Sequence, residues 1–157
     1  MLKAGLGGAG VGFVLAIIAA VLTPFCNPCV ALLLGLGVGV LAAVWERPAT
    51  PGASAGEGAK AGGIASVGSL VGQMIGAAAN GLIVGPSGAA ELYRQLDIQV
   101  PVQVTEQSYW AYNIGGNCLC GVVNVALAAG LGALGGILWY QVSGKNQPPA
   151  SPLQGTL

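Results

Sequence analysis

The sequence predicts an all-α integral membrane protein with four transmembrane helices, and two observations lead to this fold class. Of the 157 residues, 54% are hydrophobic and only 6% are charged, and the mean hydropathy is +0.76. The few charged residues are absent from residues 4–45, 61–90 and 107–144. Each of these gaps can hold a membrane span of about 20 residues, and the first can hold two.

The first two spans form a predicted hairpin over residues 1–45. We expect its first span at about residues 6–22, as a retained helix, because no convincing small-residue cleavage site follows it. The second span is expected at about residues 28–45, because Asn27 is a natural N-cap and Pro28 a natural first helical residue.

A second predicted hairpin covers residues 61–141. It follows a segment rich in Pro, Gly and Ala, residues 46–60, which we expect to be a flexible cytoplasmic linker. The third and fourth spans are expected at about 61–84 and 114–140. A polar, Pro-rich tail, residues 142–157, is expected to be disordered.

Residues 86–113 form the predicted outer loop. A short helix is expected in its first part, with Leu92 and Leu96 on one side. An extended segment with strand-like alternation is expected over 98–105. The apolar side of the loop is expected to lie on the membrane surface or on the helix ends, and a strand that binds a partner is the alternative.

The distribution of basic residues predicts a multi-pass protein of the plasma (cell inner) membrane with both termini in the cytoplasm. Four of the five basic residues would then lie inside, and only Arg94 would lie in the outer loop. Counting about 1.5 Å per residue from Trp45 and Trp139 places Cys29 and Cys120 near the outer boundary.

The two hairpins resemble each other in sequence. Residues 27–45 and 117–139 each have Asn and cysteines at the start, then G-x-G-x-L followed by two small residues, and then Trp. We interpret the chain as two tandem hairpins, a parallel repeat whose halves are related by an axis along the membrane normal.

Glycine accounts for 28 residues, well above the usual share of about 7%. In lipid, small residues let helix backbones approach closely. In the third span Gly68, Gly72 and Gly76 lie four residues apart and predict a groove, and in the fourth span Gly132 and Gly136 predict a matching ridge. Packing within the bundle is the expected use, and packing in a homo-oligomer or against other membrane-protein subunits is a compatible alternative.

Four amide side chains fall inside the spans. Gln73 and Asn80 share one face of the third span, and Asn117 and Asn124 share one face of the fourth. We expect them to hydrogen-bond between helices, and the lining of a small channel or carrier is the alternative. No ionisable carboxylate, amine or guanidinium lies in any span, which argues against a proton relay.

The four-span, glycine-rich chain resembles the proteolipid rotor subunits of V-type ATPases. That resemblance implies a membrane-embedded carboxylate in an even-numbered span, and spans 28–45 and 114–140 contain none. A proton-carrying rotor role is therefore excluded.

Cys26 and Cys29 form a Cys-x-Pro-Cys motif at the start of a predicted helix, an arrangement typical of thiol redox sites. The layout resembles that of the quinone-linked disulfide oxidoreductases of the DsbB type, which share four spans and a cysteine pair at the outer start of the second helix. This chain differs from them because its second pair, Cys118 and Cys120, is Cys-x-Cys and no Arg follows the first pair.

Structural disulfides that link Cys26 or Cys29 to Cys118 or Cys120 are the preferred interpretation. Such a link would close a loop of about 90 residues and contribute about 4 kcal/mol in the chain-entropy model. Thiol exchange, a metal site of four thiolates and free buried thiols are the alternatives. The chain contains no His, so mixed Cys/His sites and His-ligated haem are excluded, and no cofactor is expected.

The sequence favours a structural or accessory role, as a tightly packed scaffold or small subunit of a membrane assembly. The chain has neither a Ser/His/Asp set nor paired carboxylates, and it has no phosphate loop. Since it also lacks a basic patch, we expect membrane lipid and other membrane-protein chains as partners, and no nucleic acid. A membrane thiol-disulfide oxidoreductase is the first alternative and a channel or carrier is the second.

Overall fold

The computed structural model describes residues 1–22, 28–97 and 105–146. Four helices, α1 (Leu2–Leu22), α2 (Pro28–Glu46), α3 (Pro51–Gln95) and α4 (Glu106–Val142), make up almost all of this part, and a short 3-10 turn, η1 (Gly144–Asn146), follows. The described residues contain no strand, and all four helices are long and apolar enough to cross a membrane. The prediction of an all-helical fold with four helices able to span a membrane is confirmed.

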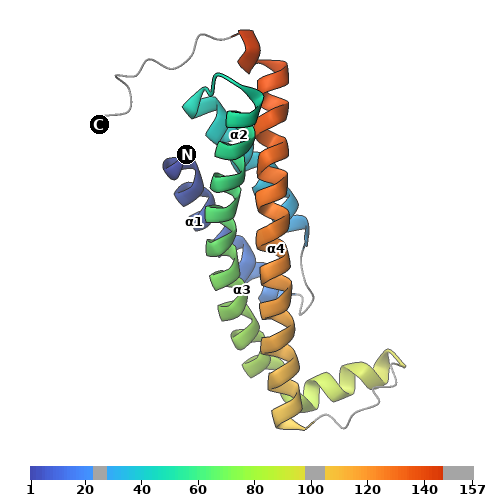
Figure 1. Ribbon diagram of the computed structural model, residues 1–157. Coiled ribbons are helices and arrows are strands. Elements are labelled where there is room, and N and C mark those ends of the chain that lie inside the picture. Colours follow the sequence, from blue (N-terminus) through green and yellow to red (C-terminus); the bar gives the residue numbers. More distant parts are fainter. Residues whose placement is uncertain (23–27, 98–104, 147–157) are drawn as a thin grey trace.

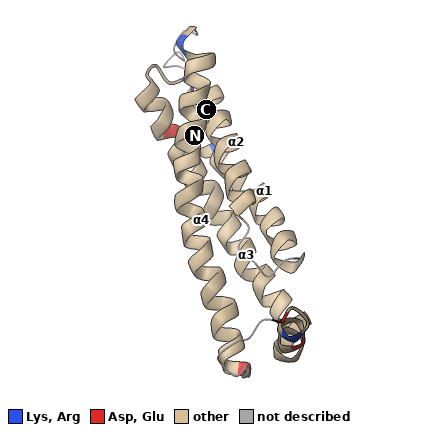
Figure 2. Ribbon diagram, turned by 90° about the vertical axis from the view of Figure 1, so that its right-hand side faces the viewer, with Lys and Arg blue, Asp and Glu red and all other residues tan. Residues whose placement is uncertain are grey.

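The helices alternate in direction, so that α1 and α3 run one way and α2 and α4 the other (Figure 1). We call the end where α1 and α3 begin the linker end, and the opposite end, where α4 begins, the loop end. Charged residues gather toward these two ends, and the middle of the bundle is free of them (Figure 2). This distribution fits a bundle whose middle lies in hydrocarbon.

Helix α3 begins at Pro51, and this start corrects the prediction of a flexible linker over residues 46–60. The Thr50 side chain accepts a hydrogen bond from the Ala53 amide at 3.1 Å, and Pro51 occupies the first turn. Ser54 is fully buried against α4 and donates to the Gly136 carbonyl at 2.7 Å. The cap and this burial hold as helix a segment whose Pro and Gly content suggested a mobile chain.

A sharp bend divides α3 at Gly85, which has φ 65° and ψ 175°. This conformation is open essentially to glycine alone, and Pro86 then starts a new helical run to Gln95 that points away from the bundle (Figure 1). The expected extended segment lies almost wholly outside the described residues. Helix α4 begins at Glu106, earlier than expected, because Thr105 and Ser108 form a capping box.

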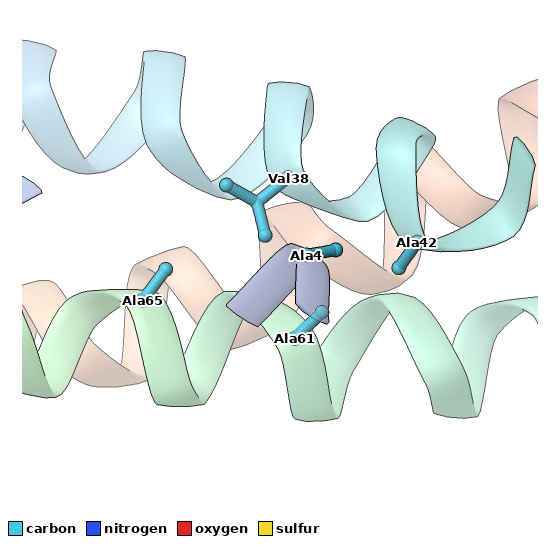
Figure 3. Close-up of a cluster of buried hydrophobic side chains, with 5 residues drawn as sticks. All are labelled: Ala4, Val38, Ala42, Ala61 and Ala65. Atoms are coloured by element: carbon cyan, nitrogen blue, oxygen red, sulfur yellow. The ribbon is translucent and has the colours of Figure 1, made fainter. Parts of the chain in front are cut away.

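The helices pack across the two predicted hairpins. Helix α3 contacts α1 and α4 extensively, α2 lies mainly on α4, and the contact between α1 and α2 is slight. The buried cluster of Figure 3 joins three helices through small side chains, namely Ala4, Val38, Ala42, Ala61 and Ala65. Backbones that approach this closely gain dispersion contacts in place of a hydrophobic drive, which lipid does not supply.

Candidate functional site

The glycine groove of α3 receives α1. A Cβ placed on Gly68 would lie 2.8 Å from Cα of Ala9, and one placed on Gly72 would lie 3.0 Å from Cα of Phe13. Gly76 is equally close to α1, because its Cβ would lie 2.6 Å from the Ala20 methyl group. These three glycines therefore pack against α1 and not against the expected ridge on α4.

The ridge on α4 instead packs against the start of α3, which the sequence did not single out, and against the G-x-G motif of α2. Gly132 lies between two other glycines. A Cβ placed on Gly58 of α3 would lie 2.9 Å from the carbonyl carbon of Gly132, and one placed on Gly39 of α2 would lie 2.7 Å from its Cα. Gly136 takes the Ser54 hydrogen bond one turn further along. Three backbones therefore meet at Gly132.

Ser54, Gly58 and Gly62 line the α4-facing side of α3 at intervals of four residues, and all three are buried. This spacing is present in the sequence and could have identified the contact with α4. It was missed because the first two lie in the segment interpreted as a linker.

The residues that the internal repeat equates lie beside each other. Gly35 contacts Ala128 and Gly39 contacts Gly132, so a residue of α2 lies level with the residue 93 positions later in α4. The same offset aligns the two G-x-G-x-L motifs of the repeat. Helices α2 and α4 therefore form a parallel pair with equivalent residues in contact.

Three of the four intramembrane amides, Gln73, Asn80 and Asn117, take part in hydrogen bonds between helices. The Gln73 side chain donates to Asn117 Oδ1 at 3.1 Å and so links α3 to α4. The Asn80 side chain donates to the Val21 carbonyl at 3.1 Å and so links α3 to α1. Asn117 also donates to the Asn113 carbonyl within α4 at 2.8 Å.

Asn124 differs from the other three amides. It is buried, and its Oδ1 accepts no hydrogen bond from any described residue. A cavity of about 10 Å³ lies beside it where all four helices meet, and Ser69 and Gln73 also line this cavity. The polar groups of the interior are thus concentrated toward the loop end, whereas the contacts at Gly58, Gly132 and Gly136 are made by backbone and small side chains.

The described cysteines correct the expectation of disulfides. Cys29, Cys118 and Cys120 are free thiols, the first two exposed and the third half-buried, and Cys26 lies outside the described residues. By the register of α2 on α4, Cys29 is level with residue 122, about 3 Å along the axis from Cys120 and 6 Å from Cys118. The heights therefore match, but the exposed Cys29 and Cys118 side chains face outward and do not meet.

The described residues hold no group of three or more His, Cys, Asp or Glu side chains that could bind a metal ion. Comparison of the chain with protein-family models, with curated proteins and with solved structures found no match.

Proposed function

We propose that the protein is a structural or accessory component of a membrane assembly, a packed scaffold that associates laterally with further copies of itself. The observation that carries the proposal is a pair of glycines left over from internal packing. Gly37 of α2 and Gly130 of α4 are exposed, and a Cβ on either would meet nothing within 4 Å. By the register of the two helices they lie at the same height.

Small residues on a lipid-facing surface let a second helix approach closely. Within the chain, the glycines two residues further along, Gly39 and Gly132, already make such a contact. The same type of contact is therefore available to another copy at Gly37 and Gly130. The exposed apolar side chains around them, Leu33, Leu41 and Leu134, suit either lipid or a neighbouring chain.

The test is the mass of the protein in mild detergent and in lipid nanodiscs, for the native chain and for a Gly37→Leu/Gly130→Leu variant. We expect an oligomer for the native chain and a folded monomer for the variant. Gly56→Leu is the control, because a Cβ on the half-buried Gly56 would likewise meet nothing within 4 Å, but Gly56 lies on α3. A native chain that is monomeric in both media would refute the proposal.

The close contact at Gly132 speaks against the channel alternative. A polar lumen would have to pass between α2, α3 and α4 at the height where their backbones touch. Side chains could not move aside to open it, because glycines have none. A channel would therefore require the helices themselves to separate.

Thiol exchange is a second candidate, favoured by one observation. Cys29 is a free, exposed thiol in the first turn of α2. Its thiolate would attack a partner's disulfide, form a mixed disulfide and release one partner thiol. A Cys26→Ala variant should trap that mixed disulfide, and a Cys29→Ala variant should not. If neither variant captures a partner, this candidate fails.

We further propose that the linker end faces the cytoplasm. Lys3, Arg47, Lys60 and Lys145 lie toward this end, and Arg94 lies beyond the loop end. Short loops on the cytoplasmic side of a membrane carry an excess of Lys and Arg. A reporter that fluoresces only in the cytoplasm, fused after residue 146, should be bright, and a dark fusion in a correctly inserted chain would reverse the orientation.

A further inference from the structure

The packing of the bundle leaves the polar cavity beside Asn124 without an explanation. Among the described residues, Asn124 Oδ1 is the one fully buried side-chain nitrogen or oxygen without a hydrogen-bond partner. Only 8% of the Asn124 surface is exposed. An unpaired acceptor this deeply buried destabilises a fold, so a native chain normally supplies it with a donor.

The walls of the cavity show which donor fits. Ala16 and Ala20 of α1 and Val30 of α2 form its apolar side. Ser69 and Gln73 of α3 form its polar side, together with Asn124 of α4. The Ser69 hydroxyl can both donate and accept a hydrogen bond. The Gln73 side chain is held in position beside the cavity by its hydrogen bond to Asn117.

The size of the cavity fits a very small ligand. Its volume of about 10 Å³ is near the minimum needed for one water molecule, roughly 10–15 Å³. A buried water is retained when it has two to four polar partners, and three polar side chains face this space. An ion would need a charged group, and none of the lining residues carries one.

We propose that this cavity is a binding site for a single structural water molecule, which donates a hydrogen bond to Asn124 Oδ1 and is held by Ser69 and Gln73. The water bridges Ser69 of α3 and Asn124 of α4, whose side chains form no direct hydrogen bond with each other. This inference does not depend on the proposed assembly, because every residue of the site belongs to one chain.

The direct test is water-edited solid-state NMR of the native, isotope-labelled chain in lipid bilayers. Magnetisation from water should reach the Asn124 side-chain amide nearly as fast as it reaches the exposed Asn146 side chain. The backbone amide of Gly132, enclosed by other glycines, is the dry reference. Build-up at Asn124 as slow as at Gly132 would overturn the proposal.

A double-mutant cycle tests the bridge. The unfolding equilibrium constant is measured for Ser69→Ala, Asn124→Leu and the double variant. Loss of a shared water should couple the two sites by roughly threefold, as hydrogen bonds between membrane helices do on average. The control is Ser66→Ala with Asn124→Leu, which should be additive because the Ser66 hydroxyl donates to Gly63 in its own helix.

Additive effects of Ser69→Ala and Asn124→Leu would contradict the bridge, as would an Asn124→Leu variant more stable than the native chain. Should Asn124→Leu fail to fold, the NMR measurement on the native chain decides alone, because it needs no substitution.

Discussion

The contact between Gly39 and Gly132 makes a prediction whose size follows from the geometry. In Gly39→Ala the new methyl carbon would lie 2.7 Å from Cα of Gly132, whereas ordinary contact begins at 3.4 Å. The carbonyl oxygen of Gly132 lies closer still, so helices α2 and α4 must move apart by more than about 0.7 Å. A gap of 0.5–1 Å already removes roughly a quarter to a half of the dispersion energy of the atoms that line it.

We expect Gly39→Ala to lower the free energy of unfolding by about 1–3 kcal/mol, the usual range for overpacking. Gly37→Ala is the matched control, because it lies on the same helix and its Cβ would meet nothing within 4 Å. There the better helix propensity of Ala should raise stability, by up to about 1 kcal/mol. The two variants should therefore move in opposite directions.

The assay is reversible unfolding in mixed micelles, followed by circular dichroism, at a protein concentration that keeps single chains apart. The pair Gly132→Ala and Gly130→Ala repeats the comparison from the α4 side, since Gly130 also has open space around it. If Gly39→Ala proves as stable as Gly37→Ala, the close approach of α2 and α4 is wrong, together with the argument against a channel.

Three further predictions concern other parts of the chain. Gly85→Ala should lower stability by about 1–3 kcal/mol through backbone strain alone, since its Cβ would meet nothing within 4 Å; Gly56→Ala, at an ordinary helical position, should not, and equal stabilities in thermal melts would contradict the bend. Gln73→Leu should cost about 0.6 kcal/mol and couple to Asn117→Leu in a double-mutant cycle, because the two side chains bond across α3 and α4, whereas Gln95→Leu should not couple. Alkylation of the detergent-solubilised protein with N-ethylmaleimide, without reductant, should modify all three described cysteines, and a mass that shows two of them disulfide-linked would restore the disulfide interpretation.

The four spans could be predicted because the absence of charge over long stretches is a property of the sequence alone. The true length of α3 could not, because Pro and Gly have two meanings near a helix start. Pro51 suits a first turn as well as a linker, and only the burial of Ser54 and Gly58 against α4 decides between them. The composition of a segment does not distinguish one Pro or Gly position from another, whereas packing depends on the residue at each position.

The candidate site shows a second limit of the same kind. The spacing of Gly68, Gly72 and Gly76 identifies a groove but not its occupant, because α1 and α4 both offer small residues. Counting residues likewise placed the cysteines at matching heights, but pairing also requires that side chains face each other around the helix. The sequence periodicity shows which residues share a face of one helix. How that helix is rotated relative to its neighbours depends on all of its contacts together.

The contacts that α4 makes with α2 and α3 differ between the two halves of the bundle, and this difference orders the expected effects of substitution there. Toward the linker end, α2, α3 and α4 meet through backbone at Gly39, Gly58 and Gly132, so even one added methyl group must separate helices. Toward the loop end, the amides Gln73 and Asn124 make individual hydrogen bonds or border the cavity, so a lost group is felt locally. Close glycine contacts toward the linker end, and a polar region with room for one water toward the loop end, suit a membrane scaffold through whose interior no solute passes. A carrier would require the opposite order of effects: added methyl groups at the glycine contacts would have to destabilise the protein less than loss of the amides does.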